Sequence, residues 1–317
     1  ACASSLYAIK IACEQLHSGR VDMMVAGGVS CADSLYTQIG FTQLRALSPS
    51  GRCSPFDKNA DGLVVGEGAG VVVLKRLEDA VSCGDHIFGV ICGAGWSNDI
   101  EGNLVAPASE GQIRAMQSAY ASAGWLPCDV QYIECHGSAT PVGDNIELKS
   151  MVSVWQNAGL LSQDSGFSQH HAEDKNLAAY KNLGSKKFKQ GCAIGSVKSM
   201  TGHLLTAAGI AGFIKTLIAI NEKFLPPSLN FSEPTPNSPL HTTGFYVQTE
   251  PDDWKPMPLT QDKDKNKYSA RRAGVSAFGF GGINAHILVE EFCKDNFSIY
   301  FSKSKESEDI DPSQNTI

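Results

Sequence analysis

The chain has 317 residues, of which 42% are hydrophobic and 19% charged, and its net charge at pH 7 is −7. These values describe a globular protein with a substantial core, and the acidic balance argues against a nucleic-acid-binding protein. No run of about 18 apolar residues predicts a membrane span, and the N-terminus lacks a signal peptide pattern. The ten cysteines are scattered without CxxC pairs, which argues against a disulfide framework and favours a reducing, cytoplasmic compartment.

The first predicted element is an amphipathic helix that begins just after Cys2. Its apolar residues recur on one helical face: Leu6, Ile9, Cys13 and Leu16. Unpaired N–H groups and the macrodipole at this helix N-terminus favour a thiolate on Cys2, and its small neighbours leave the sulfur accessible. Because a helix placed in this way normally follows a strand, the sequence indicates a piece of a longer chain.

Strand and helix patterns then alternate. Strands are predicted at residues 21–28, 71–74, 87–93, 130–135, 192–195, 245–249, 274–278 and 285–290. Helices are predicted at residues 76–81, 110–123, 144–155 and 204–220, and Asp144 with Glu147 resembles a capping box. Residues 48–70 are predicted as a loop and residues 157–190 as a polar excursion with one short helix. The order indicates an α/β protein whose sheet is covered on both faces.

Four elements could carry chemistry: Cys2, His136 at a strand end, the segment from Lys198 to His203, and the glycine-rich residues 278–282. Each alone has an ordinary structural explanation, as a buried thiol, a hydrogen-bonded polar group, a surface lysine or a tight turn. Together they are more specific. A sulfur nucleophile needs an oxyanion hole, which N–H groups of a glycine-rich turn can form. Forming a carbon–carbon bond from a malonyl unit also needs donors for the enolate, which two histidines can supply.

These motifs resemble those of the β-ketoacyl synthase (ketosynthase) domain of fatty acid and polyketide synthases, within the thiolase superfamily. The matching segments are residues 1–6 (nucleophile motif), 51–70 (central signature), 134–147 (first histidine motif), 195–209 (lysine–histidine motif) and 274–286 (closing glycine-rich strand pair). The resemblance covers residues 1–292, and so many ordered matches make it specific. It implies a thiolase-like α/β fold with five layers, α-β-α-β-α.

The resemblance implies a role for each matched residue. Cys2 would carry the acyl chain as a thioester, and the N–H groups of Cys2 and Phe280 would form the oxyanion hole. Phe280 would also gate the acyl pocket. His136 and His203 would act in decarboxylation of malonyl-carrier protein and stabilise the enolate. Lys198 would maintain the charge and hydrogen bonds around them.

Substrate and partner contacts are also implied. Ser138 and Thr140 would contact the 4′-phosphopantetheine arm of acyl carrier protein, because hydroxyl groups suit its amides. No cofactor bound by the domain itself and no metal are expected, since the Cys and His residues lack zinc spacing. The expected partners are acyl carrier protein, a neighbouring acyltransferase or other synthase domains, and a second copy in a homodimer.

Two positions depart from the family pattern. Residues 138–140 read Ser-Ala-Thr in place of the commoner Thr-Gly-Thr, which keeps both hydroxyl groups. Gly212 stands where free-standing bacterial synthases usually carry a glutamate near the lysine. The chain is therefore most similar to ketosynthases of iterative multidomain synthases that make polyketides or polyunsaturated fatty acids.

The resemblance also implies that most of the first half of the fold precedes Cys2. Residues 1–75 would be the end of the N-terminal half, residues 76–292 the C-terminal half, and residues 293–317 a polar linker or tail. Because the first sheet would then lack neighbouring strands, we expect residues 1–317 not to form an active enzyme alone.

The expected reaction is decarboxylative Claisen condensation of an acyl thioester on Cys2 with malonyl-carrier protein, in fatty acid or polyketide biosynthesis. An inactive or decarboxylation-only partner of a ketosynthase would usually lack the cysteine. A thiolase-type enzyme using coenzyme A esters would normally carry a second cysteine where Lys198 and His203 stand. A cysteine protease needs only Cys and His, and the surrounding motifs count against it.

Overall fold

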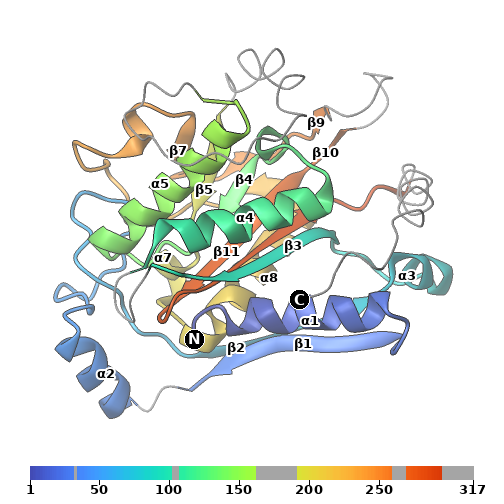
Figure 1. Cartoon of the computed structure of the whole chain (residues 1–317), viewed down its shortest axis with the longest axis horizontal. Coiled ribbons are helices and arrows are strands. Elements are labelled where there is room, and N and C mark those ends of the chain that lie inside the picture. The colour runs from blue at the N-terminus through green and yellow to red at the C-terminus, as the bar shows by residue number, and fades with distance from the viewer. Residues whose placement is uncertain (32–33, 102–106, 162–190, 259–268, 295–317) are drawn as a thin grey trace.

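The computed structural model describes residues 1–31, 34–101, 107–161, 191–258 and 269–294. Helices and strands form alternating layers in this part of the chain (Figure 1). The helices α4 (Ser109–Ala123) and α5 (Pro141–Asn157) cover one face of a six-stranded sheet. The helices α1 (Ser4–His17) and α8 (Ala208–Glu222) lie between that sheet and a two-stranded sheet. Helices therefore cover both faces of the larger sheet, as the sequence predicts.

The larger sheet places three functional segments at one edge. Its strands run in the order β3 (Val90–Asn98), β12 (Ile283–Glu290), β11 (Arg272–Gly279), β4 (Tyr132–Glu134), β5 (Cys192–Gly195) and β7 (Phe245–Val247). From β11 to β7 neighbours are parallel, whereas β12 is antiparallel to β11 and to β3. Because parallel strands end at the same edge, His136, Lys198 and the turn after Gly279 lie close together.

Two apolar cores hold the layers together. Between α4, α5 and the sheet, the aromatic rings of Tyr120 and Trp155 pack edge to face, with centroids 5.9 Å apart. On the other face, α1 and α8 bury Leu6 and Phe213 against the sheet. α8 is apolar nearly all round because it contacts both sheets.

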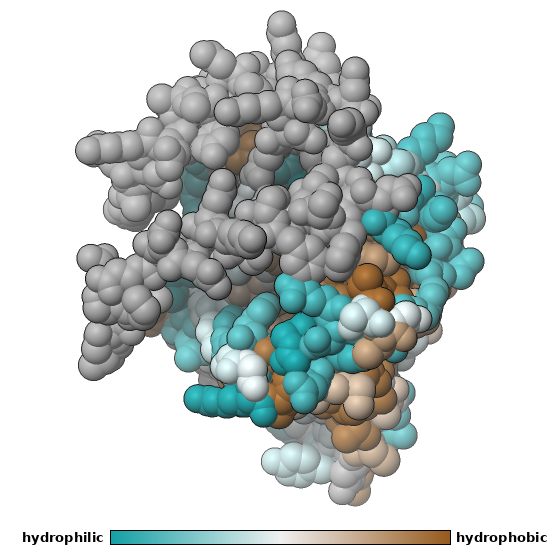
Figure 2. Space-filling model, turned by 90° about the vertical axis from the view of Figure 1, so that its right-hand side faces the viewer, coloured by the Kyte–Doolittle hydropathy of each residue, from teal (hydrophilic) through white to brown (hydrophobic). Residues whose placement is uncertain are grey.

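The smaller sheet pairs β1 (Met23–Ser30) with β2 (Gly68–Lys75) in antiparallel register. One face of it packs on α1 and α8. The apolar side chains that remain exposed on these strands are Met23, Val25, Val29, Val71 and Val73. Figure 2 shows apolar (brown) surface in the middle and lower right of the face that it presents.

The remaining elements are short. They are the helices α2 (Ser34–Gln43), α3 (Leu77–Cys83) and α7 (Lys198–Thr201), the 3-10 turns η1 (Pro127–Asp129), η4 (Leu205–Ala207) and η5 (Pro239–His241), and the strands β6 (Phe224–Leu225), β8 (Asp252–Asp253), β9 (Met257–Pro258) and β10 (Ser269–Ala270). β6 pairs with β8, and β9 with β10. The long stretch between α2 and β2 forms only isolated bridges.

Most predicted elements are present, but one helix is not predicted and one prediction is wrong. The helix α2 was not predicted, because its apolar residues Leu35, Tyr36 and Ile39 are exposed and form no core-facing stripe. The capping box of Asp144 and Glu147 is wrong. The helix α5 begins at Pro141, and both carboxylates bond loop N–H groups instead. The predicted excursion at 157–190 and tail at 293–317 lie mostly outside the described residues.

One segment among the described residues, Leu205–Glu222, has the length and apolar composition of a membrane-spanning helix. Half of it is buried inside the protein. Because it contains α8, which packs between two sheets, we interpret it as a core helix.

Candidate active site

Cys2 lies immediately before α1 and against the turn between β11 and β12. Only 4% of the residue is exposed. A Cβ atom on Gly279 would lie 2.9 Å from the backbone nitrogen of Cys2, so only glycine allows this close approach. The glycine turn and the cysteine, which are separated by nearly the whole chain, therefore form one site.

The expectation of a resting thiolate on Cys2 is wrong. Burial raises the pKa of the thiol above its usual value near 9. The charge of Lys198 and hydrogen bonds from the backbone N–H groups of Phe280 and Cys2 lower the pKa, but burial has the larger effect. The thiol is therefore protonated at neutral pH. The same two N–H groups are those expected to form the oxyanion hole.

His136 and His203 face each other at the ends of neighbouring chain segments. Their ring centroids are 5.2 Å apart, with an angle of 78° between the planes. Burial, aided by the charge of Lys198, lowers the pKa of both rings well below 6.5. Both imidazoles are therefore neutral at pH 7.

The tautomer of His203 follows from its neighbour. The N–H of Leu205 donates to Nδ1 of His203 over 3.0 Å, so Nδ1 carries no proton. In the neutral ring the proton is then on Nε2, which becomes a hydrogen-bond donor. His136 keeps a buried Nδ1 that has no hydrogen-bond partner among the described residues.

Lys198 joins the two strand ends. It is 3% exposed, and its ammonium group donates to the backbone carbonyl of His136. Ser196 donates to the carbonyl of Gly137 over 2.9 Å and adds a second link. A buried cation therefore lies beside both histidines and is close enough to affect the Cys2 thiol.

Two buried carboxylates hold the loop that carries His136. Glu147 accepts the N–H groups of His136 and Gly137 over 2.7 and 2.8 Å. Asp144 accepts the N–H of Phe56 over 2.7 Å and that of Ala139 over 3.2 Å. Burial raises the pKa of each carboxyl group to about 7, although these hydrogen bonds act in the opposite direction.

The two hydroxyl groups expected to contact pantetheine lie together. Ser138 and Thr140 are hydrogen-bonded to each other over 2.9 Å. Ala139 between them has a φ of +62°, a left-handed conformation that glycine adopts without strain. The family's commoner Thr-Gly-Thr would therefore suit this backbone better than the Ser-Ala-Thr of the present chain.

Three nearby residues were given no role from the sequence. Phe41 of α2 packs its ring 5.5 Å from that of Phe280. Glu134 and Lys215 form a buried ion pair with an N–O distance of 2.9 Å. The sequence feature that could have pointed to this ion pair is Gly212, where the family pattern usually has a glutamate near the lysine motif.

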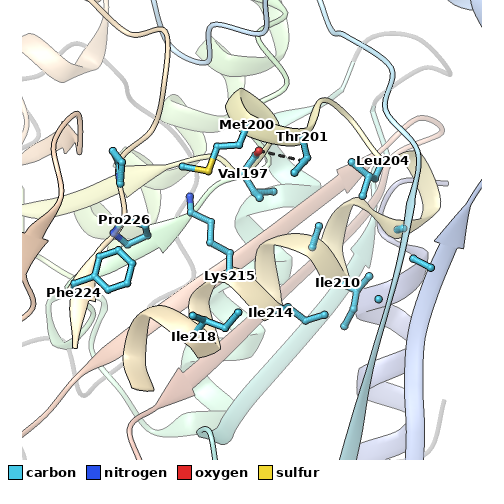
Figure 3. A pocket seen from close by; sticks show the side chains of 15 residues that line it. Val197, Met200, Thr201, Leu204, Ile210, Ile214, Lys215, Ile218, Phe224 and Pro226 are labelled. Atoms are coloured by element: carbon cyan, nitrogen blue, oxygen red, sulfur yellow. Dashed lines mark hydrogen bonds between the residues drawn. The ribbon is translucent and has the colours of Figure 1, made fainter. Parts of the chain in front are cut away.

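No group of three or more His, Cys, Asp or Glu side chains that could hold a metal lies in the described part of the chain. All ten cysteines are within that part and are free thiols. An apolar cavity of about 460 Å³ lies on the side of α8, between α7 and the prolines 226 and 227 (Figure 3). Neither Cys2 nor the two histidines line the cavity, so we do not assign it to the candidate active site.

The family follows from sequence comparison. A model of the β-ketoacyl synthase N-terminal domain matches residues 1–80, and one of the C-terminal domain matches residues 88–167 and 166–232. The chain belongs to the β-ketoacyl synthase family. Its fold is the thiolase-like fold of ketosynthases.

Particular relatives are polyketide synthases. A phenolphthiocerol/phthiocerol polyketide synthase of Mycobacterium tuberculosis is 40% identical over 292 residues, which are 92% of this chain and 14% of that protein. Polyketide synthase PksN of Bacillus subtilis is 37% identical over 293 residues, 92% of this chain and 5% of that protein. The chain thus spans a small part of the length of these relatives.

Solved structures agree. The ketosynthase from module 6 of the bacillaene synthase of Bacillus subtilis has a TM-score of 0.76 and 35% identity, over 98% of this chain and 52% of that one. The PfaC keto synthase-chain length factor has a TM-score of 0.74 and 38% identity, over 92% of this chain and 27% of that one.

Proposed function

We propose that this chain catalyses decarboxylative Claisen condensation as part of a larger polyketide or fatty acid synthase. The reaction joins an acyl thioester to malonyl-carrier protein and releases β-ketoacyl-carrier protein and carbon dioxide. The observation that supports this most is the neutral pair of His136 and His203, with His203 fixed as an Nε2–H donor. The charge of Lys198 acts on both rings and on the Cys2 thiol.

The first step transfers the acyl chain. The Cys2 sulfur attacks the acyl thioester, a new C–S bond forms, and the bond to the carrier sulfur breaks. The proton of Cys2 goes to the departing carrier thiol. The N–H groups of Cys2 and Phe280 would stabilise the oxyanion that forms during the attack.

The second step releases carbon dioxide. The bond between the malonyl carboxylate and its neighbouring carbon breaks, and the electron pair moves to the thioester carbonyl as an enolate. Donors on His136 and His203 would stabilise the enolate oxygen, since both rings are neutral.

The third step is the condensation. The enolate carbon attacks the acyl group on Cys2, a C–C bond forms, and the C–S bond to Cys2 breaks. The sulfur takes a proton from solvent.

The substrates and partners follow from the same proposal. Ser138 and Thr140, whose hydroxyl groups lie together, would bind the 4′-phosphopantetheine arm of acyl carrier protein. A neighbouring acyltransferase, a homodimer and a cytoplasmic location belong to the proposal. What supports a larger synthase is that the relatives are polyketide synthases, of which this chain matches a part.

The proposal is tested with Cys2→Ala in the full-length parent protein. We expect the variant to form no extended acyl chain, because no sulfur is left to hold the first substrate. Decarboxylation of malonyl-carrier protein should persist, since it depends on the histidines. Chain extension by the variant would refute the proposal.

A further inference from the structure

A buried carboxylate lies two residues before His136. The Glu134 side chain is 2% exposed and sits at the end of β4. Its Oε1 accepts the N–H of Val197 over 2.5 Å. Its Oε2 accepts the hydroxyl of Tyr132 over 2.6 Å and the ammonium group of Lys215 over 2.9 Å. The buried charge is therefore both paired and hydrogen-bonded, the condition under which such a charge is tolerated.

Gly212 on α8 makes room for this carboxylate. A Cβ atom at that position would lie 2.8 Å from Cγ of Glu134 and 3.4 Å from its Oε1. Any side chain at position 212 would therefore compete for the space that Glu134 fills. The carboxylate in this space comes from β4 and not from α8.

The network reaches the catalytic segment through the backbone. Val197 is the residue before Lys198 and the N-cap of α7. The strand that carries Glu134 continues into His136, so its side chain links this strand end to the turn that leads to Lys198. Lys215 extends from α8 toward this turn and forms part of the wall of the apolar cavity (Figure 3).

We propose that Glu134 and Lys215 are positioning residues that set the distance between His136 and the segment from Lys198 to His203. Gly212 leaves on α8 the space that this strand-borne carboxylate occupies. This inference rests on the proposed function, because it assigns decarboxylation to the two histidines.

The test separates the two half-reactions in the full-length parent. Acylation of Cys2 is followed by intact-peptide mass spectrometry, and carbon dioxide release from malonyl-carrier protein is followed independently. Glu134→Ala should lower kcat for decarboxylation by about 100-fold, since a misplacement near 1 Å has that effect. The rate of Cys2 acylation should stay within about threefold, because the oxyanion hole lies on another turn. Asp85→Ala, which breaks an exposed ion pair with Lys75, is the control and should change neither rate.

A second variant moves the carboxylate from β4 to α8. In Glu134→Ala with Gly212→Glu, the space that Glu134 leaves can accept the new side chain, and decarboxylation should recover to within about tenfold of wild type. The isosteric Glu134→Gln keeps the size of the side chain and removes its charge. It should also lower the rate of decarboxylation, and it provides the test if Glu134→Ala does not fold.

Equal losses of acylation and decarboxylation in both Glu134 variants would overturn the inference, because they indicate only less folded protein. Unchanged decarboxylation in Glu134→Gln and Glu134→Ala would also overturn it. If the wild-type parent itself neither acylates Cys2 nor releases carbon dioxide, the proposed function fails and the inference fails with it.

Discussion

At the scale of single residues, the Cys2 thiol is subject to opposing effects. Burial disfavours the thiolate, whereas the Lys198 charge and two N–H groups favour it. Burial has the largest effect, so the sulfur is a thiol at neutral pH. The sequence predicts that Cys2 lies at a helix N-terminus. That position alone does not determine whether a buried cysteine is charged.

Alkylation of Cys2 tests this balance. We expect its rate with iodoacetamide to keep rising above pH 9, because only the thiolate reacts and burial raises the thiol pKa above that value. The rate is measured by mass spectrometry of the Cys2 peptide in the parent protein, with Cys2→Ala as the blank. A plateau between pH 7 and 8 would contradict the assignment.

Ala139 is a second residue whose environment can be tested. Its φ of +62° is costly for any residue with a Cβ atom. Replacing Ala139 with glycine should therefore stabilise the domain by about 1 kcal/mol. The midpoint of denaturant unfolding of the ketosynthase domain in the parent measures this.

A matched alanine-to-glycine change in a helix gives the opposite sign. Ala8 lies inside α1, so Ala8→Gly should destabilise the domain by about 1 kcal/mol. Destabilisation by Ala139→Gly would show that its left-handed backbone carries no strain.

At the scale of elements, the turn that follows α7 determines the donor on His203. Its Nδ1 accepts from Leu205, which leaves Nε2 to donate. Decarboxylation should therefore fall by about 100- to 1,000-fold in His203→Ala, the usual loss for one oxyanion donor. His203→Gln, which can place an amide N–H near the Nε2 position, should lose less than His203→Asn, whose amide reaches only the Nδ1 position.

The comparison uses carbon dioxide release from malonyl-carrier protein. Equal activity of the asparagine and glutamine variants would contradict the tautomer. The two histidines should contribute no titration of activity near pH 6.5, since both are neutral there.

The sequence predicts the elements better than it predicts their contacts. Amphipathic or continuously apolar segments such as α1, β5 and β11 were recognised because burial controls their pattern. The helix α2 was missed because it exposes its apolar side chains. The contacts of Asp144 and Glu147 also could not be predicted. Local spacing resembles a helix cap, whereas the real partners, such as Phe56, are distant in sequence.

At the scale of the molecule, the family resemblance gave the candidate site its residues, and the fold brings them together. Gly279 touches Cys2, and Lys198 reaches His136, although long stretches of chain separate each pair. The Glu134–Lys215 network could not be predicted, because a buried ion pair between a strand and a helix leaves no periodic pattern. The one related feature in the sequence is Gly212, a glycine where the family pattern usually has a glutamate.

The buried carboxylates make folding stability depend on pH. Asp144 and Glu147 have folded-state pKa values of about 7, above the unfolded values of about 4. Their contribution to stability is fully present below about pH 4 and is lost as the pH rises through about 7. Glu147→Gln removes one such group and keeps one oxygen that can accept a backbone N–H bond. Its stability relative to wild type should therefore increase between pH 4 and 7 and level off above.

Thermal unfolding of wild type and Glu147→Gln at matched pH values measures this difference. The exposed pair of Lys75 and Asp85 provides the control, because Asp85→Asn should not reproduce the trend. A stability difference that is constant from pH 4 to 8 would contradict the raised pKa of Glu147.

The central claim is that Cys2 carries the growing chain before condensation. The full-length parent is incubated with an acyl-carrier protein, and the Cys2 peptide is analysed by mass spectrometry before and after malonyl-carrier protein is added. The claim predicts an acyl adduct on Cys2 that disappears as β-ketoacyl product and carbon dioxide form in equal amounts. Product formation without any adduct on Cys2, or in Cys2→Ala, would contradict it.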